Sequence, residues 1–229
     1  MSEPLRIVHL LFPDLTALDL AGPAQVFSHL PGVEQSFAWH RIESIPTDAG
    51  FAVLPTTTFT EASPADVVFV PGGEGAFALL EDEVALDFLR RQAVGATLVT
   101  SVCTGSFVLA GAGLLTGRRA TTHWAWFDLL PLLGVVPVRE RVVRDGTVIT
   151  GAGVTSGIDF ALTVTAQLAG VDVARGRQLT LEYAPQPPFD AGGPDRPDAD
   201  PRQVAAARVA MAARWGPAVT RAAQRLRLP

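Results

Sequence analysis

The chain has 229 residues, 48% of them hydrophobic, and a formal net charge of −5. This length supports one large α/β domain with a full core. The negative charge argues against a protein that binds nucleic acids or membrane surfaces. All 18 basic residues are Arg, which excludes a P-loop lysine, a lysine Schiff base and a Ser/Lys dyad. One cysteine excludes an internal disulfide and, with no recognisable signal peptide or transmembrane run, leads us to expect a cytoplasmic protein.

The first predicted element is an apolar strand over residues 6–12, of the kind found in the centre of parallel sheets. His9 lies within it, and we expect a neutral, hydrogen-bonded core histidine there. A loop over residues 13–23 leads into a predicted helix over 24–30. Asp19 lies in this loop, at the carboxyl end of the strand, where doubly wound sheets have their ligand crevice. Its residue type alone favours a role as the cap of the following helix over a role as a carboxyl that faces the ligand crevice.

The next predicted elements are strands over residues 37–45, 51–59 and 66–70 and an amphipathic helix over 83–94. We expect Val94 to face inward at the end of that helix. The last of these strands is followed by Gly72 and Gly73, whose backbone N–H groups can bind a ligand; a simple tight turn is the alternative. The alternation of strands and helices indicates an α/β protein.

The one cysteine lies between a predicted strand and a predicted helix. Residues 97–102 are apolar and rich in β-branched side chains, and residues 105–110 are mostly small or apolar. A cysteine in such a turn, followed by Thr and Gly, is typical of a nucleophile elbow. The helix N-terminus would favour a thiolate at Cys103. A buried structural cysteine is the alternative, but the setting favours a reactive thiol.

Beyond this turn, His123 is a candidate base, because Cys/His pairs are common nucleophile arrangements. A helix-cap or pocket-wall histidine is the alternative. Trp124 and Trp126 follow, and we expect one of them in the core and the other in a substrate pocket. Residues 142–150 predict a hairpin around Asp145–Gly146, a strong type I′ turn signal.

The C-terminal part of the chain predicts helices over residues 151–168 and 171–183, an extended arm over 185–201 and an Ala/Arg helix over 202–227. We expect the last helix to break near Gly216–Pro217. Its arginines alternate with alanines without interleaved aromatic residues, so we expect a solvated or dimer-packing helix. We expect the chain to divide into an α/β domain, residues 1–184, and a C-terminal arm with its helix, residues 185–229. The arm and helix would pack on the same domain or on a dimer partner.

Four motifs together resemble the ThiJ/PfpI superfamily: Leu18–Pro23, Val70–Gly73, Ser101–Ser106 and Thr121–Trp124. The resemblance covers nearly the whole chain and implies a flavodoxin-like, doubly wound, mostly parallel sheet of the class I glutamine-amidotransferase-like type. Within the superfamily, the pattern is most similar to that of the branch that hydrates isonitriles. Peptidase relatives carry His directly after the cysteine, where this chain has Thr104, so the resemblance does not support proteolysis.

The resemblance implies catalytic roles for Asp19, Cys103 and Thr104, and it makes a catalytic carboxyl the expected role of Asp19. We expect water addition to R–N≡C, which gives an N-substituted formamide, through a Cys103 thioimidate with Asp19 as general acid and base. The backbone N–H groups of Gly73 and Thr104 would form an oxyanion site. A substrate pocket is expected around four residues: Gly72, His123, Trp124 and Val154.

Neither a metal nor a cofactor is expected, because four scattered histidines and one cysteine give no ligand spacing. The expected partners are a small isonitrile and a second copy of the chain, since members of the superfamily are usually dimers. Two alternatives stay open: a non-catalytic small-molecule sensor domain, and a glyoxalase or carbonyl-stress enzyme of the same superfamily, for which His123 would matter more.

Overall fold

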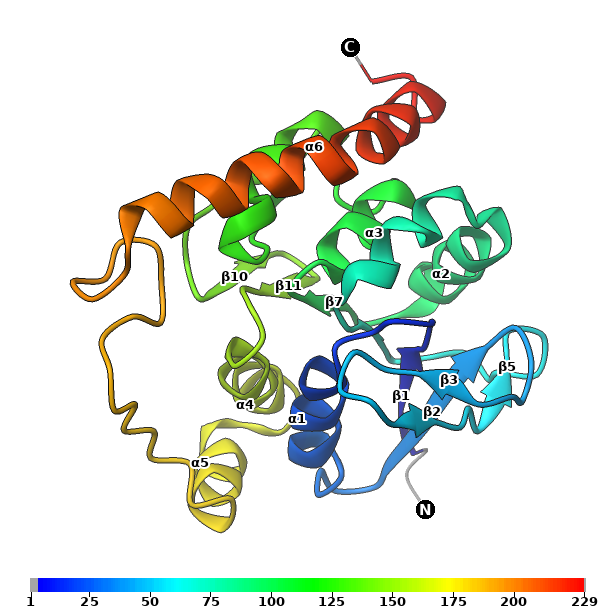
Figure 1. The fold of residues 1–229 in the computed structure, drawn as a ribbon. Coiled ribbons are helices and arrows are strands. Elements are labelled where there is room, and N and C mark those ends of the chain that lie inside the picture. Colours follow the sequence, from blue (N-terminus) through cyan, green and yellow to red (C-terminus); the bar gives the residue numbers. More distant parts are fainter. Residues whose placement is uncertain (1–3, 229) are drawn as a thin grey trace.

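A seven-stranded, mostly parallel sheet forms the centre of the fold (Figure 1). The computed structural model describes residues 4–228, so residues 1–3 and 229 of the predicted division lie outside it. The strand order is β10-β11-β7-β6-β1-β2-β5, and only β10 is antiparallel to its neighbour. The strands are Leu5–Leu10 (β1), Val33–Trp39 (β2), Thr57–Thr58 (β5), Val67–Val70 (β6), Leu98–Val102 (β7), Val142–Asp145 (β10) and Val148–Gly151 (β11).

Helices cover both faces of this sheet, because its central strands are apolar on both sides. In β6, for example, Val68 and Val70 face one core while Phe69 faces the other. α1, α4 and α5 lie on one face, and α2, α3 and three 3₁₀ segments lie on the other (Figure 1). These elements are Ala17–Phe27 (α1), Glu83–Gly95 (α2), Gly105–Gly111 (α3), Ser156–Ala169 (α4), Val171–Thr180 (α5), Glu74–Phe77 (η1), Leu79–Glu81 (η2) and Trp124–Leu133 (η3). The predicted doubly wound α/β fold is confirmed.

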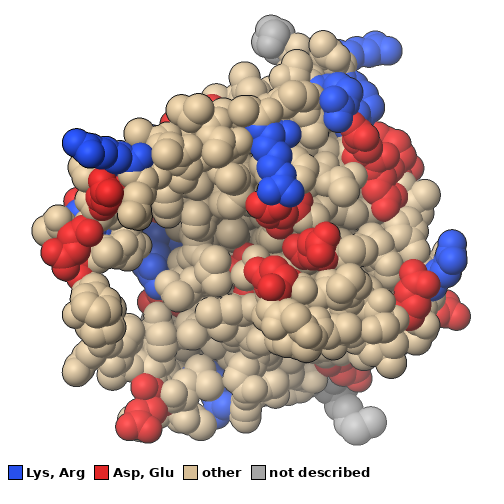
Figure 2. All heavy atoms as spheres, in the orientation of Figure 1, with Lys and Arg blue, Asp and Glu red and all other residues tan. Residues whose placement is uncertain are grey.

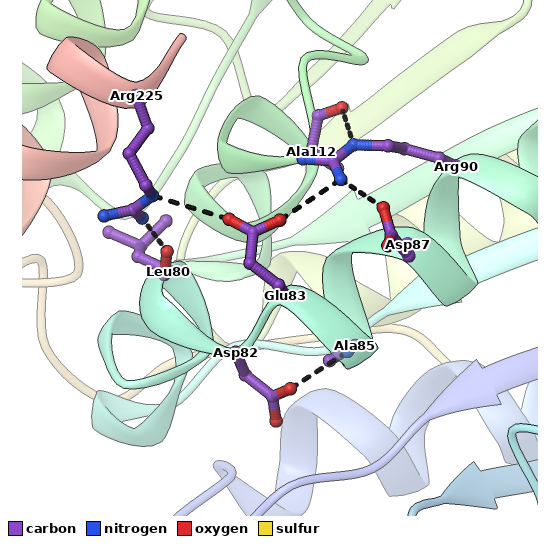
Figure 3. A network of polar contacts seen from close by, with 8 residues as sticks. All are labelled: Leu80, Asp82, Glu83, Ala85, Asp87, Arg90, Ala112 and Arg225. Atoms are coloured by element: carbon purple, nitrogen blue, oxygen red, sulfur yellow. Dashed lines mark hydrogen bonds and ion pairs between the residues drawn. The ribbon is translucent and has the colours of Figure 1, made fainter.

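The last helix, α6 (Pro201–Arg225), packs on η3. Three of its side chains are buried in the core: Ala218, Val219 and Ala222. Figure 3 shows Glu83 of α2 between Arg90 and Arg225, so ion pairs also join this helix to the domain. Exposed pairs of this kind contribute at most about 1 kcal/mol each, so the apolar contacts hold α6 in place. Within residues 4–228 no helix combines the length and the apolarity needed to cross a bilayer.

Several predicted elements are found close to their expected bounds. The strand and helix on either side of Cys103 are β7 and α3, and the hairpin around Asp145–Gly146 is β10 with β11. His9 is fully buried, and its Nε2 lies 2.8 Å from Gln35 Oε1. Burial lowers the pKa of His9 to about 4, an effect that the bond to Gln35 opposes. The prediction of a neutral core histidine is therefore confirmed.

The predicted helix boundaries around prolines are wrong. α1 begins at Ala17, not at residue 24, and contains Pro23, which packs against Gly157 of α4. α6 continues through Pro217 without the predicted break. A proline inside a helix removes one internal hydrogen bond. In α1, buried side chains on either side of Pro23 outweigh that loss. In α6, Trp215 stacks on Phe77 before Pro217, and Ala218 and Val219 are buried after it. Val94, predicted to face inward, is exposed at the end of α2.

The two strands predicted at residues 37–45 and 51–59 are also wrong. β2 ends at Trp39, and the following segment forms only short pairs: β3 (Ile45–Pro46) with β4 (Ala52–Val53), and β5 with β2. Phe51 is largely exposed, so the apolar pattern there does not mark a core strand. Prolines in the segment cannot donate to a ladder. Another short parallel pair joins Arg119–Ala120 (β8) to Val136–Pro137 (β9).

Candidate active site

Cys103 lies in the turn between β7 and α3 with a backbone φ of 53°. A positive φ is uncommon for a non-glycine residue and persists only where the surroundings enforce it. Here the Cys103 N–H donates to the carbonyl oxygens of Gly151 and Ala152, at 3.0 and 2.9 Å. The turn therefore presents the cysteine at the carboxyl edge of the sheet, which is the geometry of a nucleophile elbow.

Two glycines allow the backbone segments to converge on this turn. A Cβ atom on Gly105 would lie 2.3 Å from the Val70 carbonyl oxygen. A Cβ atom on Gly72 would lie 2.5 Å from both Asp19 Oδ2 and Cys103 Cβ. Gly72, predicted as a pocket residue, therefore lies against the carboxyl and the thiol, and a side chain there would displace one of them.

Asp19 lies in the first turn of α1 and is fully buried beside Cys103. The cap that its residue type alone favoured is not found, because Thr16 holds the N-cap position. Asp19 Oδ2 accepts a hydrogen bond from the Gly72 N–H at 3.1 Å, and the carboxyl also bonds to the Cys103 thiol. Asp19 Oδ1 has no hydrogen-bond partner among residues 4–228. Burial raises the pKa of Asp19 to about 7, although both hydrogen bonds oppose this rise.

Burial also raises the pKa of the Cys103 thiol, and the charge of Asp19 raises it further. The Thr104 N–H, which bonds to the sulfur, acts in the opposite direction but does not prevail. The thiolate expected from the helix N-terminus is therefore corrected: desolvation outweighs the helix N-terminus at a fully buried sulfur. Two neighbouring acids with raised pKa values retain at least one proton between them near neutral pH.

Thr104 joins the elbow to the glycine loop after β6. Its hydroxyl donates to the Gly73 carbonyl oxygen at 2.7 Å and accepts from the Gly73 N–H at 2.8 Å. The Gly73 N–H, expected to bind a developing negative charge, is thus already engaged by Thr104. Of the two predicted donors, the Thr104 N–H is the one directed at the reactive centre, through its bond to the Cys103 sulfur.

His123 holds the N-cap position of η3, where its Nδ1 accepts from the Ala125 N–H at 3.2 Å. The ring lies against Gly153, where a Cβ atom would be 2.3 Å from His123 Cδ2. Burial lowers the pKa of His123 to about 4, so the ring is neutral at pH 7. Because Nδ1 accepts a hydrogen bond, the single ring proton lies on Nε2. His123 therefore combines the cap and pocket-wall roles and is poorly suited to act as a base.

A cavity of about 350 Å³ opens above Cys103. Cys103 and Thr104 form its floor, and His123 and Val154, both predicted, form part of its wall. Trp126 also lines it, whereas the predicted Trp124 lines a separate cavity beneath the arm and α6. The remaining lining residues are Asp14, Thr16, Asp48, Gly73 and Glu74.

The three acidic residues of this cavity are those that sequence reasoning missed. Asp14 and Asp48 lie in exposed turns, and such a position does not by itself indicate a site. Glu74 directly follows the glycine pair at the end of β6, and this position could have indicated that its side chain lies at the site. No group of three His, Cys, Asp or Glu side chains within residues 4–228 has the geometry of a metal site.

The fold and the site together define a doubly wound α/β protein with a cysteine at a nucleophile elbow. The DJ-1/PfpI family model matches residues 5–167. The chain therefore belongs to the DJ-1/PfpI family, as the motif resemblance predicted.

Relatives and solved structures support this assignment. The isonitrile hydratase of Pseudomonas putida is 56% identical over 191 residues, which are 83% of this chain and 84% of that one. The DJ-1alpha protein of Drosophila melanogaster is 33% identical over 152 residues, 64% of this chain and 70% of that one. The crystal structure of a ThiJ/PfpI family protein from Pseudomonas syringae superposes with a TM-score of 0.90 at 37% identity, and covers 97% of this chain and 91% of that one.

Proposed function

We propose that this protein is an isonitrile hydratase, which adds water to R–N≡C and forms an N-substituted formamide. The observation that carries the proposal is the pair formed by Cys103 at the floor of the cavity and the buried Asp19 beside it, which we call the floor pair. The similarity to the Pseudomonas putida isonitrile hydratase, over more than four fifths of both chains, supports the same activity.

The first step joins Cys103 to the substrate. The isonitrile carbon is a poor electrophile unless it gains a proton while the sulfur attacks it. Asp19 takes the thiol proton and delivers it to that carbon as the S–C bond forms, which gives the thioimidate R–N=CH–S–Cys103. A pair that holds one proton is sufficient, and a carboxyl with a pKa of about 7 both accepts and donates it readily near neutral pH.

The second step hydrolyses the thioimidate. Asp19 takes a proton from water as the oxygen adds to the carbon, and passes that proton to the nitrogen. The C–S bond of the resulting R–NH–CH(OH)–S–Cys103 then breaks. The hydroxyl proton returns to the sulfur through Asp19, so the formamide leaves and the thiol is restored. The Thr104 N–H stabilises the sulfur whenever it carries negative charge.

Formation of N-cyclohexylformamide from cyclohexyl isocyanide, followed by chromatography, tests the proposal. Wild-type protein should turn over this substrate, and Cys103→Ala should abolish turnover while its circular dichroism and melting temperature stay close to wild type. Turnover retained in Cys103→Ala would contradict the covalent route. Methylglyoxal turnover without formamide formation would instead favour the carbonyl-stress alternative.

We also propose that the protein works in the cytoplasm as a homodimer whose subunits each comprise the predicted α/β domain and C-terminal arm. The lone cysteine fits a reducing compartment, and the buried face of α6 ties the C-terminal region to the domain. Analytical ultracentrifugation at micromolar concentration should give a mass of two chains; a monomer would contradict the dimer.

A further inference from the structure

Three carboxylates stand in the wall of the cavity above Cys103: Asp14, Asp48 and Glu74. They come from three separate segments, the loop after β1, the turn between β3 and β4, and the start of η1. Figure 2 shows acidic side chains gathered near the middle of one face of the molecule, below the position of α6. Asp14 and Asp48 are exposed and Glu74 is partly buried, so these groups surround the entrance while the thiol lies at the bottom.

The charge of this entrance is only partly compensated. Glu74 pairs with Arg214 of α6, at 2.8 Å. Asp48 Oδ1 accepts from the Ala17 N–H at 3.0 Å, which satisfies an oxygen but adds no positive charge. Among the described residues that line the cavity, none is basic, and His123 is neutral. Three carboxylates therefore face the cavity against one guanidinium beside it.

The carboxylates belong to a built cavity and not to an open acidic surface. The thiol at its floor is 3% exposed and lines the space that they enclose. Uncharged side chains, among them those of Trp126, His123 and Val154, form other parts of the wall. A cation in this space would be attracted by the carboxylates. A carboxylate on a ligand would be repelled by the same three groups.

We propose that this acidic entrance selects ligands of Cys103 by charge, so that isonitriles with a cationic or neutral R group are accepted and those with an anionic R group are rejected. This substrate preference rests on the proposed hydratase function. The selection of charge at the thiol does not, because it follows from the cavity wall alone, and the two can therefore be tested separately.

The lone cysteine makes the first test independent of turnover. Cys103 is modified with two methanethiosulfonates of similar size, one carrying a trimethylammonium group and one a sulfonate. The ratio of their rates is divided by the same ratio for N-acetylcysteine. At low salt we expect a normalised preference for the cation of about tenfold or more. A normalised ratio near one, or a preference for the anion, would overturn the proposal.

Three charge variants locate the effect. Asp14→Asn should lower the normalised ratio about two- to threefold, and Asn tolerates the left-handed backbone of this position, where φ is 59°. Arg214→Gln should raise the ratio, because it uncovers Glu74. Asp172→Asn on α5 makes the same charge change at a solvated side chain that does not line the cavity, and it should have no effect. Equal effects of Asp14→Asn and Asp172→Asn would overturn the proposal.

A matched substrate series extends the test to the reaction. The probes are isonitriles with a trimethylammonium, a tert-butyl and a carboxylate group on the same two-carbon linker. Their kcat/KM values should fall in that order, with about tenfold or more between the first and the last. Equal values would overturn the charge preference but leave the hydratase standing. Charge-selective modification of Cys103 without turnover of any isonitrile would sustain the charge preference and refute the hydratase.

Discussion

The floor pair and the entrance of the cavity both include carboxyl side chains, but in opposite environments. In the floor pair, Asp19 is fully buried, bonded to Cys103 and Gly72, and its pKa is raised to about 7 by that burial. At the entrance, Asp14 and Asp48 remain exposed to water. A buried carboxyl at this pKa can exchange a proton during catalysis, whereas a solvated carboxylate acts mainly through its field. The burial of the carboxyl group, not its residue type, separates the two roles.

The largest difference between floor and entrance should appear in Asp19→Asn. This change keeps the shape of the side chain but removes its capacity to move a proton, so formamide turnover should fall about 100- to 10,000-fold. Steady-state kinetics with cyclohexyl isocyanide measure it. Asp14→Glu, which moves a carboxylate at the entrance without removing it, is the matched comparison, and a loss of similar size in both variants would contradict the division of roles.

The same variant should also change how stability depends on pH. The pKa of Asp19 is raised from 3.8 to about 7 in the folded chain, so between these values the folded state binds more protons than the unfolded state. Wild-type stability contributed by this group is therefore lost as pH rises from about 4 to about 7, by about 4 kcal/mol at most. In urea unfolding, Asp19→Asn should gain stability relative to wild type across that range; a pH-independent difference would contradict the raised pKa.

Gly72→Ala should have the next largest effect, because its Cβ would press on both members of the floor pair. We expect turnover to fall about 100-fold and the free energy of unfolding to drop by about 1–3 kcal/mol. Gly95→Ala is the control: a Cβ at the end of α2 meets nothing within 4 Å, and the change should be neutral or slightly stabilising. Similar losses of turnover and stability in both variants would contradict a specific effect of the Gly72 Cβ on the floor pair.

His123→Asn tests a smaller effect. A neutral wall and cap residue can be replaced by Asn, which also caps helices, so kcat should fall less than about tenfold and the pH profile should keep its midpoint. A general base would lose about 100-fold or more. A large loss of kcat with a shifted pH profile would therefore show that His123 acts as a general base, and the floor pair would then not be the sole proton-transfer group.

Sequence reasoning succeeded where a local pattern decides local geometry. The strand, the cysteine and the small residues after it predicted the elbow at Cys103, and the four motifs together predicted the family. It failed where tertiary contacts decide: α1 passes through Pro23 between buried side chains, and α6 passes through Pro217 because the side chains that follow it are buried. The thiolate prediction failed for the same reason, since burial of the sulfur cannot be read from the residues around Cys103.

The entrance could not be predicted, because it depends on the meeting of three distant segments. Asp14, Asp48 and Glu74 are separated by 34 and 26 residues in the chain, and only Glu74, directly after the glycine pair, follows a local motif. The short strand pair β3–β4 places Asp48 beside the loop after β1, where the Asp48 N–H donates to the Leu15 carbonyl oxygen. Which of Trp124 and Trp126 lines the cavity above Cys103 likewise depends on the path of η3 and could not be predicted.

The smallest expected effect separates floor and entrance without any substitution. Raising ionic strength from about 0.02 to about 0.5 M shortens the screening length from about 20 Å to about 4 Å, which weakens exposed charges far more than buried ones. The normalised cation preference at Cys103 should therefore fall severalfold. The pH midpoint of cyclohexyl isocyanide turnover, set by the buried pair, should move by less than about 0.3. If both quantities respond alike, solvent reaches the floor as freely as the entrance, and the separate roles of Asp19 and Asp14 fail together.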